Sequence, residues 1–591
     1  MSFNSFLIVS SNQVTSYDEN DLLILDNAGI NSLNLSVNSA GNGVVPQISG
    51  YYLIVFSAVG SADFTSLSLY ITSDEYTGQI PNTIAQSAIS IGDGNSQNQT
   101  QLFLNSIIYL PAGSSLSIIN SSTDEISLET TSFSGYNNNT PVGTQNLQTT
   151  SINAVSNSSN ISLLVLGLSN IPYISSSNLQ TINGTFFGAQ SIALGSACQF
   201  NNINSNSGIL YNINDSSNNL ISNGQMSNFI DPTTANADFI YLTPSINNNY
   251  NFSFLNASEL TPTPYLAIYS MTVYIQGQKV VSGSSRAQRA AESKETYTAP
   301  IYAIGINLDG NVLEQSIYGC GITTNNGVAY VTILGFCIVN ASYTNNIGLF
   351  NVGATNVGIT SGFSEIPLYN TYNTDVSSSL SQVGNNVFLT LSKIPSKYCN
   401  FYTNISTGTS GNPISVNNGG IFKLLTNGPI SSYNYSGDTY YDFLLDSEKG
   451  CIAYNGILTR TFLIMFSVTV YDVENDVVPP IALEQFIITG TPVLNTVQIK
   501  DPVLYYGNII QDSICSQYVG YSNVNSYTIY GQYIHTFNPV KVDVQGVATW
   551  DSIGIISPPQ IGDTTGAQAT YSEETAFGNV NNTTLVAVQI A

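Results

Sequence analysis

Residues 50–57 read GYYLIVFS, a run of aromatic and β-branched residues that favours an extended strand. Shorter runs of the same kind, such as residues 65–70 and 462–471, occur along the chain and are bounded by Gly, Asn, Asp and Ser clusters. Turn signals recur about every 8 to 15 residues, a spacing typical of sandwiches and jelly rolls. The sequence therefore predicts an all-β protein of tandem antiparallel β-sandwiches.

Positive charge is almost absent from this chain. Its 591 residues include 36 acidic and 11 basic residues, which gives a formal net charge of -25. Residues 1–278 contain no Lys and no Arg. With so few ion pairs, the surface must be hydrated through Asn, Ser, Thr, Gln and Tyr side chains. This composition indicates selection against cations by something outside the fold.

Two hypotheses explain the missing cations. At about pH 2 to 3 carboxylates are mostly neutral, whereas Lys and Arg stay charged and repel one another, so removing them keeps the protein nearly neutral in acid. This favours an acid habitat, and with it an acid-loving archaeal host. Alternatively, the composition protects the chain from trypsin-like proteases. These enzymes cleave after Lys or Arg, and the first such residue is Lys279. The sequence leaves both open.

The acidic balance also excludes some partners. Nucleic acids and anionic membranes both attract clustered cations, so neither is an expected partner. Residues 1–11, MSFNSFLIVSS, have no cationic region in front of a short apolar run, so we expect no secretory signal. The longest apolar runs, such as residues 462–470, are too short to span a membrane. We therefore expect assembly in a host cytoplasm without a signal peptide.

Several elements of the first half follow a recognisable order. The strand at residues 50–57 is followed by Ser66 to Ile71, by Leu102 to Asn120 with its Leu110-Pro111-Ala112-Gly113 turn, and by Thr131 to Tyr136. This order, over about residues 40–137, resembles the jelly roll of the tumour-necrosis-factor and complement globular-head superfamily. The resemblance implies a sandwich that trimerises through aromatic faces and binds partners rather than catalysing a reaction.

Weaker similarities to this order of strands suggest further sandwiches. One similar stretch lies between residues 238 and 275, and another between residues 327 and 395. Ser285 to Glu295 are good helix formers with an Arg289/Glu292 pair, which predicts one short helical linker. The expected units are a jelly roll at 1–140, a second sandwich at 155–277, a charged linker at 278–296, a third sandwich at 297–478 and a C-terminal β-rich region at 479–591.

Motifs for catalysis are missing. His535 is the single histidine, so it provides neither a second imidazole for a metal site nor a convincing triad. Nucleotide-binding and nucleophile-elbow motifs do not occur. The six cysteines are scattered without a CxxC pair. Their spacing is compatible both with disulfides and with buried free thiols. We therefore expect no enzyme and no cofactor other than calcium.

Two groups of carboxylates could hold calcium through oxygen ligands, or could serve as a glycosidase acid pair. The alternative is that both are solvated loops, as expected in an acidic chain. The candidates are Asp438, Asp442, Asp446 and Glu448 in one group, and Asp472, Glu474 and Asp476 in the other.

Asparagine sequons are numerous, and glycans there would supply the hydration that charges do not. The glycosylation candidates are Asn98, Asn120, Asn157, Asn183, Asn251, Asn340, Asn404 and Asn434.

A string of jelly rolls without enzyme motifs is similar to virion turret, spike and capsid proteins. We expect a structural virion surface protein, in a turret, spike or penton-associated position, that assembles with copies of itself as a symmetric trimer or pentamer and also contacts other capsid proteins. Tyr-rich segments such as Tyr518 to Tyr533 would contact neighbours, a host protein or a host glycan. The alternatives are a cell-surface appendage, S-layer-like or adhesin subunit and, less favoured, a glycan-cleaving enzyme.

Overall fold

Nearly all regular structure in the chain is β-strand. Two single turns of 3-10 helix are described, η1 (Glu314–Ser316) and η3 (Gln511–Ser513). The predicted all-β sandwich fold is confirmed. In the part of the chain that is described, no helix is long and apolar enough to cross a membrane. The computed structural model describes residues 5–90, 99–134, 155–169, 181–225, 251–276, 301–353, 365–368, 385–404, 420–471, 480–515, 524–558 and 574–591, with gaps of up to seven residues inside these ranges.

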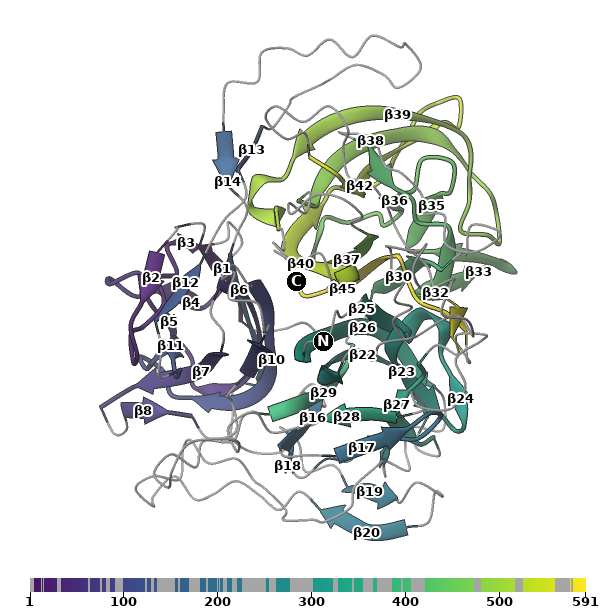
Figure 1. Ribbon diagram of the computed structural model, residues 1–591. Coiled ribbons are helices and arrows are strands. Elements are labelled where there is room, and N and C mark those ends of the chain that lie inside the picture. The colour runs from purple at the N-terminus through teal and green to yellow at the C-terminus, as the bar shows by residue number, and fades with distance from the viewer. Residues whose placement is uncertain are drawn as a thin grey trace, which may run out of the picture.

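Three jelly rolls with the same strand order follow one another along the chain (Figure 1). In the first, one sheet has the order β1-β15-β6-β10 and the other the order β5-β11-β7-β9. Its strands are β1 (Phe6–Ser11), β5 (Val44–Pro46), β6 (Gly50–Ser61), β7 (Phe64–Thr72), β9 (Ala85–Ser90), β10 (Gln99–Leu110), β11 (Ser115–Asn120) and β15 (Ile161–Ser169).

The second jelly roll repeats this arrangement, with the sheet orders β16-β29-β22-β26 and β21-β27-β23-β25. In both sandwiches the first sheet joins the first, last, third and sixth of the eight strands. The strands are β16 (Thr181–Phe187), β21 (Asn251–Phe254), β22 (Thr263–Gln276), β23 (Ile301–Leu308), β25 (Tyr318–Ile322), β26 (Val328–Ala341), β27 (Ile347–Asn351) and β29 (Asn385–Lys393).

The third jelly roll has the sheet orders β30-β45-β37-β40 and β36-β42-β38-β39. The same connectivity therefore occurs three times. The strands are β30 (Tyr398–Thr403), β36 (Cys451–Tyr454), β37 (Arg460–Tyr471), β38 (Ala482–Pro492), β39 (Ile499–Ile509), β40 (Val524–Phe537), β42 (Ala548–Ile556) and β45 (Thr583–Gln589).

The remaining strands are short and lie at sheet edges or in separate hairpins. They are β2 (Thr15–Tyr17), β3 (Asn27–Ala28), β4 (Leu35–Val37), β8 (Thr77–Gln79), β12 (Ile126–Leu128), β13 (Ser132–Ser134), β14 (Val155–Asn157), β17 (Gln190–Ala193), β18 (Asn202–Ser205), β19 (Leu210–Asn214), β20 (Leu220–Gln225), β24 (Asn311–Val312), β28 (Glu365–Leu368), β31 (Ile421–Phe422), β32 (Thr426–Ile430), β33 (Ser432–Tyr435), β34 (Asp438–Tyr441), β35 (Phe443–Asp446), β41 (Lys541–Val542), β43 (Glu574–Thr575) and β44 (Gly578–Asn579).

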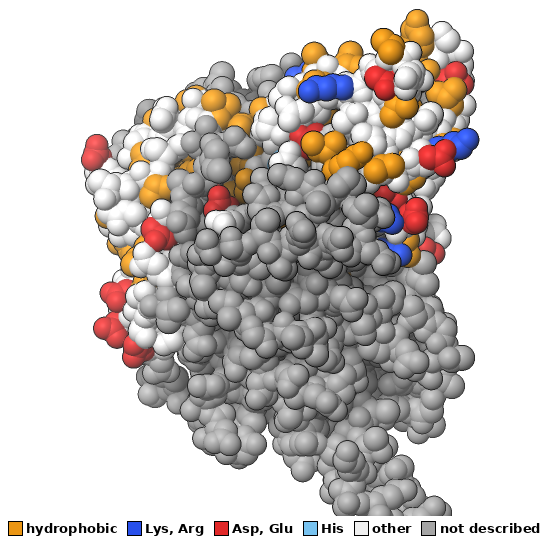
Figure 2. All heavy atoms as spheres, turned by 90° about the horizontal axis from the view of Figure 1, so that it is seen from above, with side chains coloured by type: hydrophobic (Ala, Val, Ile, Leu, Met, Phe, Trp, Pro, Cys, Tyr) orange, Lys and Arg blue, Asp and Glu red, His pale blue; other side chains and the backbone are white. Residues whose placement is uncertain are grey.

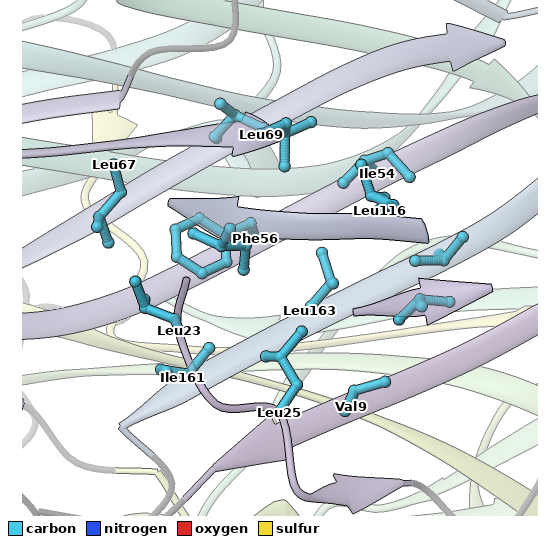
Figure 3. Close-up of a cluster of buried hydrophobic side chains, with 14 of the residues drawn as sticks. Val9, Leu23, Leu25, Ile54, Phe56, Leu67, Leu69, Leu116, Ile161 and Leu163 are labelled. Atoms are coloured by element: carbon cyan, nitrogen blue, oxygen red, sulfur yellow. The ribbon is translucent and has the colours of Figure 1, made fainter. Parts of the chain in front are cut away.

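The run at residues 50–57 is continuously apolar because β6 is buried on both faces. Ile54 and Phe56 point into the core between the two sheets of the first sandwich, opposite Leu69 and Leu116 (Figure 3). Leu53 and Val55 point the other way, into a core shared by all three sandwiches. A strand covered on both faces needs no polar side.

The same division holds in the equivalent strands of the other sandwiches. In β22, Tyr265 and Tyr269 belong to the core of the second sandwich, and Leu266 and Ile268 belong to the shared core. In β37, the alternating residues from Phe462 to Val468 fill the third sandwich, while Leu463 and Met465 reach the shared core. Each sandwich thus turns one apolar sheet face towards the other two.

An aromatic cluster joins the three sandwiches. Phe103 of β10, Phe336 of β26 and Tyr530 of β40 come from the same strand position in their sandwiches, and all three are buried. The Tyr530 ring makes edge contacts with Phe103 at 5.7 Å and with Phe336 at 5.6 Å between centroids. Figure 1 shows the three lobes arranged around these strands.

Hydrogen-bonded pairing continues across two of the three seams between sandwiches. β9 of the first sandwich pairs with β26 of the second, and β25 of the second pairs with β40 of the third. Polar side chains add to the first seam: Asn105 Oδ1 accepts from Asn183 Nδ2 at 3.0 Å and from Thr390 Oγ1 at 2.7 Å. At the remaining seam, Gln532 Nε2 of the third sandwich donates to Ser162 Oγ of the first at 2.9 Å.

Strand pairing divides the chain differently from the predicted units. The first sandwich ends at Ser169 with β15, not near residue 140, and β29 completes the second sandwich. The third begins at Tyr398 and continues across the predicted break at residue 479. These boundaries were misplaced because the last strand of one sandwich is followed closely by the first strand of the next. The predicted helical linker, residues 278–296, lies outside the described residues.

Truncation of the aromatic cluster should destabilise the whole protein. We expect Phe336→Ala to lower the free energy of unfolding by about 3 to 5 kcal/mol, because it removes a fully buried ring and leaves a cavity. Tyr435→Ala is the matched control, because the Tyr435 side chain is 68% exposed. This substitution should change the free energy of unfolding by about 0.5 kcal/mol or less. Equal losses for the two variants in urea unfolding would contradict the shared core.

Candidate functional site

Exposed apolar side chains gather on the third sandwich. Of twelve large hydrophobic side chains that the described residues expose, eleven lie in the third sandwich and one, Leu33, in the first. The first sandwich also contains no Lys or Arg, whereas Lys500 and Lys541 are exposed in the third. In Figure 2 the lobe at the left edge shows acidic side chains and no basic ones, whereas the lobe at the upper right shows basic side chains together with acidic and hydrophobic ones.

Three connections bring most of these residues to one end of the third sandwich. The end of β38 pairs with the starts of both β39 and β42, which places residues 493–498 and 543–547 together. Val540 N donates to Gly456 O at 3.0 Å and so adds the loop at residues 456–458. We call this region the apolar end, and its exposed members are Ile457, Leu458, Val493, Leu494, Val542, Val544 and Val547.

A tyrosine hairpin, residues 432–441, lies beside the apolar end. Among the described strands, β33 pairs with β34 alone, in the register Tyr433↔Tyr440 and Tyr435↔Asp438. The two turn residues, Ser436 and Gly437, have φ values of 53° and 93°. Positive φ at both central positions is the type I′ geometry that matches the twist of a two-residue hairpin.

One face of the tyrosine hairpin is aromatic. The rings of Tyr433 and Tyr440 stack with centroids 5.4 Å apart and an interplanar angle of 13°. Tyr435 lies on the same face, two residues from Tyr433, and Asp438 is its cross-strand partner. Tyr433 is 51% exposed and Tyr435 is 68% exposed, so the rings are open to solvent.

Polar contacts hold the hairpin against the body of the sandwich. Asn495, in the turn between β38 and β39, accepts from Thr439 N at 2.6 Å and donates to Asp438 Oδ1 at 3.1 Å. At the base, the buried Asp442 forms an ion pair with Lys397 and accepts from Ser431 Oγ at 2.7 Å. Because both ends are anchored, the ribbon has a defined position that an isolated hairpin would lack.

The sequence analysis pointed to a different tyrosine segment. Of Tyr518 to Tyr533, Tyr530 belongs to the shared core and Tyr533 packs against the core of the third sandwich, while residues 516–523 lie outside the described part. The hairpin was missed, although SYNYSGDTYY carries a Ser-Gly turn signal between alternating tyrosines. Tyrosine content alone could not distinguish buried rings from exposed ones.

The predicted carboxylate group does not assemble into one metal site. Asp438 bonds Asn495, Asp442 pairs with Lys397, and Asp446 closes the turn between β35 and β36. Among the described residues, no three His, Cys, Asp or Glu side chains form a group that could hold a metal ion. Glu448 is largely exposed beside Lys449. Asp472, Glu474 and Asp476 lie outside the described residues.

Two of the predicted glycosylation sites are buried. Asn120 donates to Tyr17 O at 3.0 Å, Asn183 bonds Asn105 and Thr390, and both are fully buried, so the folded protein cannot carry glycans on them. Asn340 and Asn434 are exposed, and Asn404 is partly buried. The side chains of Asn98, Asn157 and Asn251 lie outside the described residues.

The described cysteines are free thiols rather than disulfides. Four of them, Cys198, Cys337, Cys399 and Cys451, are buried, and Cys515 is partly buried. Burial raises the pKa of the Cys451 thiol, and the neighbouring carboxyls of Asp446 and Glu484 raise it further. These thiols therefore act as small hydrophobic side chains.

Comparisons with known proteins give only distant likenesses. No family model and no curated protein matches the chain. The tumour necrosis factor Eiger from S. frugiperda is 14% identical over 29% of this chain and 96% of its own, with a TM-score of 0.21. Infectious bursal disease virus structures of the Gt and Gx strains are 10% and 11% identical over 70% of this chain and 81% and 80% of theirs, both with a TM-score of 0.07. The jelly-roll assignment rests instead on the strand order.

Asp446 should make the protein more stable in acid than at neutral pH. Burial raises its pKa, although backbone amides of Lys449 and Glu448 oppose the shift by donating to Oδ1 at 3.1 Å each. Its proton is thus held more tightly in the folded than in the unfolded protein, where the pKa is about 4. This stabilisation is complete below about pH 4 and is lost as pH rises through the folded-state pKa.

We therefore expect Asp446→Asn, which keeps the Oδ1 acceptor and removes the charge, to be more stable than the wild type at about pH 7 and equal to it at about pH 3. Urea unfolding at both pH values measures the difference. A constant difference at the two pH values would contradict the assignment.

His535 should make the protein less stable in acid than at neutral pH. Burial lowers its pKa to about 4, and nearby Asp551 only partly offsets this. In the unfolded chain the pKa is about 6.5, so stability is lost as pH falls from about 6.5 to about 4. His535→Phe, which can retain the edge contact with Phe537, should remove this loss. If urea unfolding shows the same pH profile for both proteins over this range, His535 is not the titrating group.

Proposed function

We propose that this chain is a structural protein of the outer surface of a virus particle, with the apolar end directed away from the shell as an attachment surface. The observation that carries the proposal is the one-sided surface of a three-lobed block: eleven of the twelve described exposed hydrophobic side chains lie on one sandwich. Exposed apolar groups cost free energy unless a partner covers them, so their concentration in one place marks an interaction surface.

The composition supports an exposed position in acid. A chain with 11 basic residues acquires little positive charge when its carboxylates become neutral. The buried Asp446, with its raised pKa, adds stability under the same conditions. His535 works against acid stability, but it is a single group.

The core shared by the three sandwiches changes the expectation that three copies of the chain form a trimer. Aromatic faces that would join three separate subunits are already buried within one chain around Phe103, Phe336 and Tyr530. We propose that one chain takes the place of a trimer, and that copies of it meet other capsid proteins through different surfaces. A cell-surface appendage or S-layer-like subunit is the alternative, because the same one-sided surface would serve it.

Electron cryomicroscopy of the native particle or envelope tests the proposal. We expect three-lobed density projecting from a closed shell, with the third sandwich outermost. Density within a two-dimensional lattice or filament on a cell surface would replace the virion assignment with the appendage alternative. Density inside the shell would overturn both.

A further inference from the structure

We propose that the aromatic face of the tyrosine hairpin binds neutral glycans. The face consists of Tyr433, Tyr435, Tyr440 and Asp438, with Asn495 at its edge. The inference rests on the proposed attachment function and names the class of ligand and the residues that would recognise it.

The exposure of these rings is unusual for this protein. The sequence contains 37 tyrosines, and every described tyrosine other than Tyr433 and Tyr435 is buried or partly buried. Many of the others fill cores, as Tyr269, Tyr318 and Tyr530 do. Since the fold covers tyrosine rings elsewhere, two open rings on one hairpin face indicate a ligand rather than a packing role.

The positions of the tyrosine rings are fixed before a ligand binds. Stacking against Tyr440 fixes the orientation of Tyr433, and the type I′ turn and the Asn495 contacts fix the ribbon. A preorganised surface binds with little loss of conformational entropy. The C–H groups on one side of a sugar ring carry partial positive charge and are attracted to the negative face of an aromatic ring.

Polar groups at the same face suit hydroxyl-rich ligands. Asp438 and Asn495 supply carboxylate and amide groups, and Tyr435 and Tyr433 supply phenol hydroxyls, so a sugar would find both acceptors and donors. An amide or carboxylate next to an open ring face recognises hydroxyls by directional hydrogen bonds.

The charges select among glycans. Asp438 lies on the face and Asp442 lies close enough to Tyr433 to raise its pKa, after desolvation, which is the larger cause. Lys397, at the hairpin base, is paired with Asp442. Sialylated or sulfated glycans would therefore be repelled, and neutral ones accepted.

Binding of the purified full chain to an immobilised panel of neutral hexose oligosaccharides, with sialylated and sulfated oligosaccharides for comparison, tests the inference. We expect neutral members to bind, with affinity reduced about tenfold in Tyr433→Ala and in Tyr435→Ala. Tyr433→Phe keeps the ring face and should stay within about twofold. Asn434→Ala is the matched control, because this exposed residue points to the opposite face of the hairpin.

Tyr435→Ala keeps the test valid if Tyr433→Ala disturbs the hairpin, since the Tyr435 side chain is mostly in solvent. Unchanged thermal unfolding confirms that each variant is folded. The inference is overturned if no neutral glycan binds, if acidic glycans bind more tightly, or if Tyr435→Ala binds as the wild type does. Any of these results leaves the position of the protein on the particle, which microscopy determines separately, unaffected.

Discussion

Burial of both faces of the inner sheets is the constraint on which the whole molecule depends. Each inner sheet uses alternate residues for its own sandwich and for the shared core, as Ile54 and Leu53 do in β6. Where the three sheets meet, Phe103 and Phe336 both contact Tyr530. A sandwich removed from the other two would expose a complete apolar sheet face, so the three units depend on one another for stability.

This arrangement explains how the chain folds with few ion pairs. Stability comes from apolar burial and from uncharged hydrogen bonds, including the Asn105 contacts with Asn183 and Thr390 at one seam and the Gln532 contact with Ser162 at another. Such contacts do not weaken when carboxylates become neutral in acid. The scarcity of cations and the burial in the shared core are therefore consistent with each other, because stability in both cases depends little on charged groups.

Local patterns predicted much of the fold but not its assembly. Residues 50–57 were correctly placed in a jelly-roll strand, because β-branched and aromatic content is a local property. Their continuous apolar character reflects the burial of both faces of β6 in the structure, and nothing in the sequence says which neighbour covers the second face. Unit boundaries were misplaced, since short connections such as that between β29 and β30 look like turns within a sandwich.

The candidate site was predicted less well, for a related reason. Asp442 and Asp446 cluster in sequence, but strand geometry gives them separate partners, Lys397 and the turn amides. Tyr530 and Tyr435 both lie in tyrosine-rich segments, and only the tertiary structure decides that the first fills a core and the second faces solvent. Exposure depends on which strands pair over long distances, and residue type alone does not report it.

Amide hydrogen exchange of the intact wild-type and Phe336→Ala proteins, followed by mass spectrometry, tests the shared core most directly. Peptides from β10, β26 and β40 belong to three different sandwiches, and each strand contributes side chains to that core. The account predicts that all three exchange at one slow rate in the wild type and that the substitution in β26 accelerates all three. Acceleration confined to β26, with β10 and β40 unchanged, would contradict it.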